Sequence, residues 1–324
     1  MNPNRQPLRG TESPDPSHAI TRRSLLIAAL GAPALASLVA ACGDPTTEPA
    51  GTVPGTTPGT VPGTVPGTGA TGSIEHPVDP ALAIIRVSYE GGFVPQGYAF
   101  VNLPTLIVAG DGRSFMPGVT TLEFPGPLLA PMNVRAITEA GVQRLLSLAD
   151  DAGLLAPPPD YTSEADQLVA DAPNTVVTIS AAGATFSHSA YALGLMGDDG
   201  TGGDDESTPA RRTLFGFVHA LEDLAAVVGA ENLGEEAIDR PTEFRLQSYA
   251  VTEGDLASFD PAPTIVDWPA STGLDLAAAA ECARVSADAA GAIFADADQN
   301  TVFRQGDALY RLAVAAVLPG DRPC

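Results

Sequence analysis

The segment TVVTISAAGATFSHSAY, residues 175–191, decides the fold class that we expect for this chain of 324 residues. Its two ends are rich in β-branched and aromatic residues, and they flank Ala-Ala-Gly183-Ala, which predicts a β-hairpin. Thr208 and Pro209, a favoured N-cap and a favoured first helical residue, then predict a helix that ends at Gly229. The residues expected on its buried face have helical spacing: Leu214, Phe217, Val218, Leu221, Leu224 and Val228.

The same order of elements occurs earlier in the chain. Alternating polarity over residues 83–89 predicts a half-buried strand, and the apolar runs 105–109 and 113–116 flank Gly-Asp-Gly, a hairpin signal. Thr138 predicts the start of a helix that Gly153 ends. The order strand, strand, helix therefore occurs twice, without similarity between individual residues.

The last part of the chain predicts one helix among further strands. Residues 244–251 have strand character, Ser286 is a helix N-cap, and residues 301–304 and 308–317 form a closing strand pair. Hairpins that alternate with helices indicate an α+β fold, in which helices pack on an antiparallel sheet, rather than a doubly wound fold.

Composition excludes several function classes. The 16 basic residues are all arginine, so neither a phosphate-binding Walker lysine nor a lysine Schiff base can form, and we expect no cofactor. The 39 acidic residues give a formal net charge of −23, which disfavours nucleic acid as a partner because phosphate backbones bind lysine and arginine.

Composition also divides the chain. Residues 51–66 repeat Gly-Thr-Val/Thr-Pro, a pattern that favours extended polyproline-like backbone and supplies no core, so we expect residues 42–80 to form a stalk. From residue 81 the composition becomes that of a globular protein. We assign residues 81–324 to an α+β domain, with a possible internal boundary near residues 230–241.

Export and membrane attachment are indicated by the first residues of the chain. Arg22 and Arg23 precede a run without charge, residues 25–41, which is short for a membrane-spanning helix. The run ends in Val-Ala-Ala before Cys42.

These residues resemble the precursor of a bacterial lipoprotein, in which small residues precede a cysteine that becomes diacylated and N-terminal. The resemblance implies removal of residues 1–41 and a lipid anchor on Cys42, at the extracytoplasmic face of the cell membrane. The arginine pair looks like a twin-arginine signal, but Leu25 stands where that family usually has phenylalanine, so twin-arginine and general export both stay open. The whole chain resembles envelope lipoproteins of high-GC, actinobacterial-type bacteria, which brings no known activity.

Two further cysteines, Cys282 and Cys324, remain in a chain expected to be exported. In an oxidising compartment such a pair predicts a disulfide, which would stabilise the fold by about 4 kcal/mol on the chain-entropy model.

Few residues point to catalysis or to a metal. His188 lies between two serines, but neighbours on a strand point to opposite faces, so a hydrogen-bonded histidine in the sheet is the competing interpretation. His219 is expected on a solvated helix face. Acidic residues at 198–206, and Asp296 with the acids that follow it, suggest calcium ligands, but the interpretations that we adopt are a solvated loop and a helix end, without a metal.

An aromatic cluster gives the preferred functional hypothesis. Phe93, Tyr98 and Phe100 lie in a glycine-rich stretch and could bind a glycan or an envelope protein, although such residues also form cores. We therefore expect a non-enzymatic binding module. The alternatives are an envelope hydrolase that uses His188, which requires this histidine to line a pocket, and a solute-binding lipoprotein, which requires a cleft between two lobes.

Overall fold

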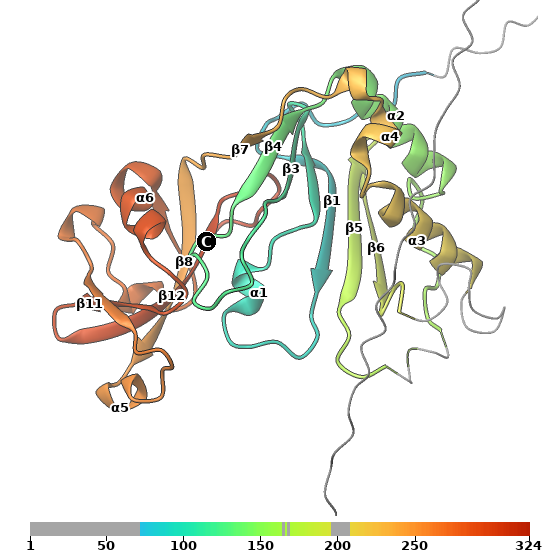
Figure 1. Ribbon diagram of the computed structural model, residues 1–324. Coiled ribbons are helices and arrows are strands. Elements are labelled where there is room, and N and C mark those ends of the chain that lie inside the picture. Colours follow the sequence, from blue (N-terminus) through green and yellow to red (C-terminus); the bar gives the residue numbers. More distant parts are fainter. Residues whose placement is uncertain (1–71, 164–165, 167–168, 196–207) are drawn as a thin grey trace, which may run out of the picture. The chain divides into compact units, whose positions relative to one another are not determined.

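The computed structural model describes residues 72–163, 166, 169–195 and 208–324, which belong to one compact unit beginning at residue 66. The predictions for Arg22, Arg23 and Cys42, for most of the stalk and for the acidic residues 198–206 lie outside the described residues. The described part contains six α-helices and twelve strands (Figure 1). The predicted α+β class is confirmed.

Seven strands form an antiparallel sheet, which we call the first sheet. Both predicted hairpins, β2–β3 and β5–β6, are confirmed, and β1 joins them by pairing with β2 and β5. The strands follow one another in space as β6 (Ala184–Tyr191), β5 (Asn174–Ala181), β1 (Ala83–Glu90), β2 (Leu106–Ala109), β3 (Arg113–Pro117), β4 (Met132–Ala136) and β7 (Ala237–Ile238).

Three helices cover one face of the first sheet: α2 (Glu139–Asp151), α3 (Pro209–Ala220) and α4 (Leu224–Val228) (Figure 1). Thr138 and Thr208 cap α2 and α3 as predicted. The single helix predicted up to Gly229 is wrong, because the chain leaves α3 at Leu221 and the Asp223 side chain accepts from Ala226 N to start α4. An internal aspartate favours such a cap over helix continuation.

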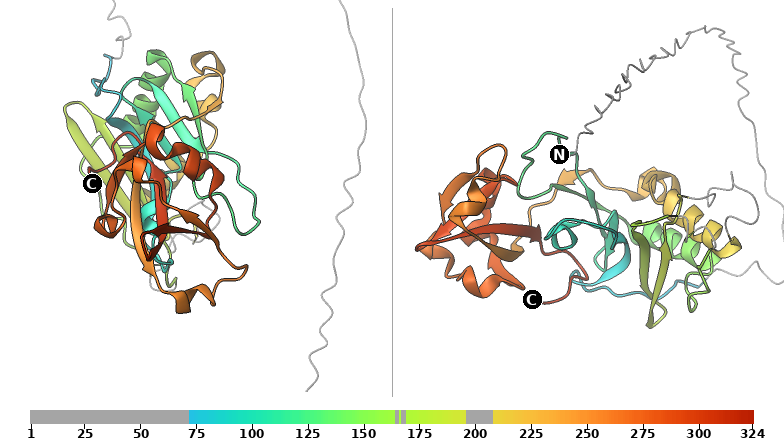
Figure 2. Two further views of the ribbon diagram at one scale, coloured as in Figure 1. Left: turned by 90° about the vertical axis from the view of Figure 1, so that its left-hand side faces the viewer. Right: turned by 90° about the horizontal axis from the view of Figure 1, so that it is seen from below.

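Five strands form the second sheet, against which α6 (Ala287–Asp296) packs (Figure 2). This sheet is mixed, because β9 pairs in parallel with β11. The strands follow one another as β10 (Ala283–Ser286), β8 (Glu243–Val251), β12 (Ala308–Ala316), β11 (Thr301–Gln305) and β9 (Thr264–Asp267).

The shorter helices connect these strands. They are α1 (Tyr98–Val101), α5 (Glu253–Leu256), η2 (Ala230–Asn232), η3 (Ala270–Thr272) and η4 (Ala277–Ala279).

The sheets change over inside the region where we expect a boundary. β7 ends the first sheet at Ile238 and β8 begins the second at Glu243, yet both sheets belong to the same compact unit. At the other end of this unit, Ile74 N donates a hydrogen bond to Gln143 Oε1 at 2.8 Å. The folded body thus begins earlier than the composition change at residue 81 indicates.

The predicted disulfide between Cys282 and Cys324 is confirmed, with Cα atoms 5.2 Å apart. It attaches the last residue to the segment just before β10. The C-terminal segment, residues 317–324, is also held by a hydrogen bond from Gly320 N to Ala81 O, 2.8 Å long. Leu318 is buried against the face of the first sheet that the helices leave open.

Candidate functional site

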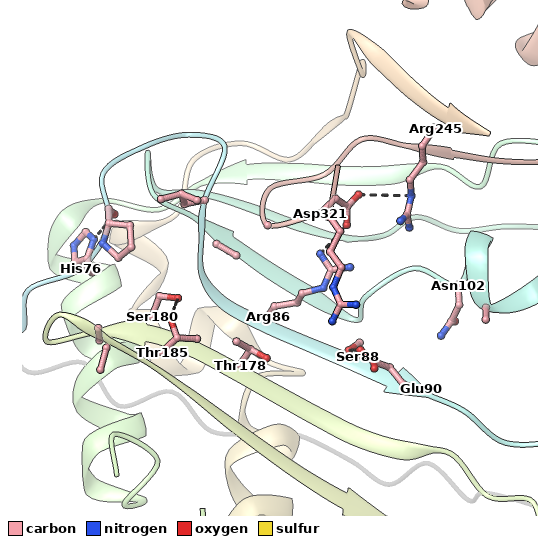
Figure 3. Close-up of a pocket in the computed structure, with 18 of the residues that line it drawn as sticks. His76, Arg86, Ser88, Glu90, Asn102, Thr178, Ser180, Thr185, Arg245 and Asp321 are labelled. Carbon is pink, nitrogen blue, oxygen red and sulfur yellow. Dashed lines mark hydrogen bonds and ion pairs between the residues drawn. The ribbon is translucent and has the colours of Figure 1, made fainter. Parts of the chain in front are cut away.

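A groove of about 1040 Å³ lies over the open face of the first sheet (Figure 3). Successive strand residues point to opposite faces, so Val177 and Ile179 enter the helix-covered core while Thr178 and Ser180 point the other way. The floor of the groove is therefore the polar half of the same alternation that builds the core.

Polar side chains of three strands form this floor. In β1 the register shifts between Ala83 and Ile85, after which Arg86, Ser88 and Glu90 lie on the groove side. Arg86 is paired with Thr178 of β5. Ser88 Oγ donates to Glu90 Oε1 at 2.7 Å, and the hydroxyls of Ser180 and Thr185 are 3.2 Å apart.

Other segments line the groove around this floor. Tyr98 and Asn102 come from α1 and the residue that ends it, and Arg245 comes from β8 of the second sheet. The C-terminal segment contributes Asp321 and Arg322. The groove is thus assembled from four separate parts of the sequence, residues 75–102, 178–185, 245 and 320–322.

The centre of the groove is an ion-pair triad. Asp321, almost fully buried, lies 3.1 Å from Arg86 Nη1 through Oδ1 and 3.7 Å from Arg245 Nε through Oδ2 (Figure 3). Asp321 Oδ2 also accepts from Leu318 N at 2.9 Å. No sequence motif predicts that these three residues meet. The placement of Arg86 on the polar side of an alternating strand was the available signal, whereas Asp321 and Arg245 meet it only through tertiary structure.

The three aromatic residues expected to bind a ligand have different surroundings. Phe93 is 90% exposed and does not line the groove, whereas Tyr98 is 47% exposed and does. Phe100 is half-buried beneath the Arg245 guanidinium, which lies 5.0 Å from its ring centre. Only Tyr98 of this cluster therefore faces the groove.

His188 lies in the helix-covered core and does not line the groove. It is fully buried, its Nδ1 is 2.8 Å from the Tyr161 hydroxyl, and its Nε2 is 2.9 Å from Leu154 O. The carbonyl can only accept, so Nε2 carries the proton and Nδ1 accepts from Tyr161. Burial raises the pKa of Tyr161 to about 12, which keeps the phenol protonated as donor. The geometric condition for a His188 hydrolase is not met.

The other two described histidines form ion pairs with glutamates outside any catalytic arrangement. His219 pairs with Glu222 on an exposed helix face, as expected, and His76 Nε2 lies 3.1 Å from Glu139 Oε1. Hydrogen bonding by Gln143 holds the pKa of Glu139 below its ordinary value. α6 runs through Asp296, and in the described part of the chain no group of three His, Cys, Asp or Glu could hold a metal.

No protein-family model, curated protein or solved structure matches this chain. Among the described helices, none has the length and apolar character needed to cross a membrane. The groove and the N-terminal residues up to Cys42 are therefore the features that bear on function.

Proposed function

We propose that this chain is a lipid-anchored binding protein of the extracytoplasmic face of a bacterial cell membrane, and that the groove is its ligand site. The observation that carries the binding role is the set of hydrogen-bonding side chains collected over an open sheet face. Concave sites in which a few polar groups converge are typical ligand sites. Anchoring is supported by the order of Arg22, Arg23, the uncharged run and Cys42.

A binding role fits the groove better than catalysis does. A nucleophilic serine is typically activated by a histidine, and in the described part of the chain no hydroxyl that lines the groove is hydrogen-bonded to one. Ser88 donates to Glu90, and Ser180 bonds Thr185. These contacts hold the hydroxyls in place as hydrogen-bonding groups.

A solute-binding lipoprotein is the second candidate, and one observation favours it. The groove is lined by Arg86 of the first sheet and Arg245 of the second. A ligand held between them would contact both sheets, as solutes do in a cleft between lobes. A transporter partner would distinguish this role from that of a general binding module.

Fractionation of an actinobacterial host that produces the full chain tests the anchor. We expect the wild-type protein in the membrane pellet, beginning at a diacylated Cys42 by intact-mass analysis, and we expect the Cys42→Ser variant to lose both the lipid and the pellet. Cys282→Ser is the matched control and should stay in the pellet. Wild-type protein that keeps Met1, or that is found in the supernatant without lipid, would contradict the anchor.

Hydrogen exchange of the detergent-solubilised full chain tests the groove. Soluble fragments of the host cell wall should slow exchange in residues 91–102 and 320–322, two segments that contribute side chains to the groove. Thr178→Trp, which fills the floor, should remove this protection. Ser189→Trp changes an exposed residue of β6 that does not line the groove, so it should keep the protection. Equal protection in both variants, or none in the wild type, would exclude the groove.

A further inference from the structure

The groove is lined by as many arginines as acids, the acids being Glu75, Glu90 and Asp321, although the chain as a whole is strongly acidic. Three of the 16 arginines line it, Arg86, Arg245 and Arg322, in a chain of formal net charge −23. The only acid within ion-pairing distance of any of them in the described part is Asp321. Asp321 is thus the carboxylate that pairs with groove arginines, and it pairs with Arg86 and Arg245.

Asp321 neutralises this charge incompletely. Its hydrogen bonds come from Arg86 Nη1 and Leu318 N, while its nearest approach to Arg245, 3.7 Å, is beyond hydrogen-bonding distance. The hydrogen bond that Arg245 does form, 3.2 Å long, goes to the neutral carbonyl of Phe100. Arg245 thus keeps both charge and N–H donors.

Arg322 adds a third guanidinium that is accessible to solvent. It is exposed, and no other described residue forms a hydrogen bond or an ion pair with it. Each guanidinium presents five donors in a planar fork that matches a carboxylate. These guanidinium groups can therefore pair with the carboxylate of a ligand, which would not be buried as an unpaired charge.

Most of the floor is unsuited to an extended peptide. Peptides that add to sheets pair with the free backbone groups of an edge strand. Two of the three floor strands, β1 and β5, are paired on both sides, and the third, β6, is an edge strand of which only Ala184 and Thr185 line the groove. Recognition over this face consequently depends on side chains.

Those side chains match a saccharide. Ser88, Thr178, Ser180, Thr185 and Asn102 supply the hydroxyls and the amide that hydrogen-bond sugar hydroxyls, and the half-exposed Tyr98 offers an aromatic face. We infer that the groove binds an acidic saccharide, whose carboxylate contacts the Arg245 and Arg322 guanidinium groups. This inference rests on the proposed function of the groove.

Calorimetric titration of the detergent-solubilised full chain tests this inference. The probe is a tetrasaccharide of alternating glucuronate and N-acetylglucosamine, and the same tetrasaccharide with its carboxylates reduced to alcohols is the comparison. We expect binding of the acidic form and at least about tenfold weaker binding of the reduced form, since hydrogen bonds to charged groups are the strong ones. Arg322→Gln should weaken acidic binding by about tenfold. Arg240→Gln removes an exposed arginine outside the groove and should leave it unchanged.

Each contrary outcome has a distinct meaning. Equal binding of the two tetrasaccharides, or an Arg322→Gln variant with wild-type affinity, would overturn the contact with the carboxylate. Binding of a hexaglutamate peptide in place of the tetrasaccharide would overturn the saccharide class but leave the groove as a ligand site. No binding of either probe would overturn the inference, while protection by cell-wall fragments would still support the proposed function. Tetrasaccharide binding that survives Thr178→Trp would count against the groove itself.

Discussion

Arg86 Nη1 lies 3.1 Å from Asp321 Oδ1, although 235 residues separate them in the sequence. Arg86 belongs to β1 of the first sheet, and Asp321 belongs to the C-terminal segment that follows β12 of the second. Asp321 also approaches Arg245 of β8. A single carboxylate thus joins both sheets at the floor of the groove, so stability and the shape of the binding site depend on the same residue.

Asp321→Asn should lower the free energy of unfolding by about 2–3 kcal/mol. Removing the carboxylate leaves the positive charges of Arg86 and Arg245 without a neutralising acid. Breaking a buried ion pair destabilises a protein more than breaking an exposed ion pair does. Urea denaturation measures the change. Asp111→Asn breaks the exposed pair with Arg113 and should cost less than about 1 kcal/mol. Equal costs in the two variants would contradict the role of Asp321 as a buried link.

Replacing Cys282 and Cys324 together by serine should lower the free energy of unfolding by about 2–4 kcal/mol. The bridge closes a long loop, with a sequence separation of 42 residues, and its loss increases the freedom of the unfolded chain. Urea denaturation with and without a reductant is the test. The reductant should destabilise the wild type and leave the double variant unaffected; a wild type that is insensitive to reduction would speak against the bridge.

Tyr161→Phe should cost about 1–3 kcal/mol, because the buried His188 Nδ1 would lose its hydrogen-bond donor. Tyr310→Phe, in the second sheet, is a control in which no tyrosine–histidine bond is lost. Thermal denaturation of both variants gives the comparison. A loss no larger than that of the control would show that the bond to His188 contributes little.

Alkaline pH should destabilise the protein partly through Tyr161. Its pKa is raised from 10.0 to about 12 in the folded chain, so the folded state holds a proton that the unfolded state releases. The free energy of unfolding therefore falls as the pH rises from about 10 to 12, by at most about 2–3 kcal/mol from this group. Burial also raises the pKa values of Tyr89 and Tyr249, so Tyr161→Phe should reduce the slope rather than abolish it. An unchanged slope would contradict this assignment.

Phe93→Ala and Phe100→Ala should differ in their effect on stability. Phe93 is 90% exposed, and its removal should change the free energy of unfolding by no more than about 0.5 kcal/mol. Phe100 packs beneath Arg245, and losing this contact should cost about 1–2 kcal/mol. Thermal denaturation separates them; a larger loss in Phe93→Ala would show that this residue contributes to the fold.

Much of the secondary structure could be predicted from local sequence. Thr138, Thr208 and Ser286 cap helices as expected, because an N-cap depends on hydrogen bonds within a few residues. The β5–β6 hairpin follows equally from alternation on either side of Gly183. The break between α3 and α4 is hidden in the sequence because the apolar stripe continues through it. The Asp223 side chain nevertheless caps a new helix there.

The candidate site was less accessible to sequence analysis. Tyr98 was found because aromatic residues in a glycine-rich stretch are conspicuous, but Phe93 and Phe100 were grouped with it although their surroundings differ. Arg86 was recognisable only as a polar position in a strand. Nothing in the sequence near Asp321 indicates its partners.

The sequence by itself determined the local elements of this chain, its α+β class and the pairing of its two remaining cysteines. Alternation, helical spacing and caps act over a few residues, and they suffice to decide which side chains point away from a core. Only the tertiary structure decided that Arg86, Arg245 and Asp321 meet over the open face of the first sheet, because long-range strand pairing and a carboxylate shared between distant arginines have no local signature.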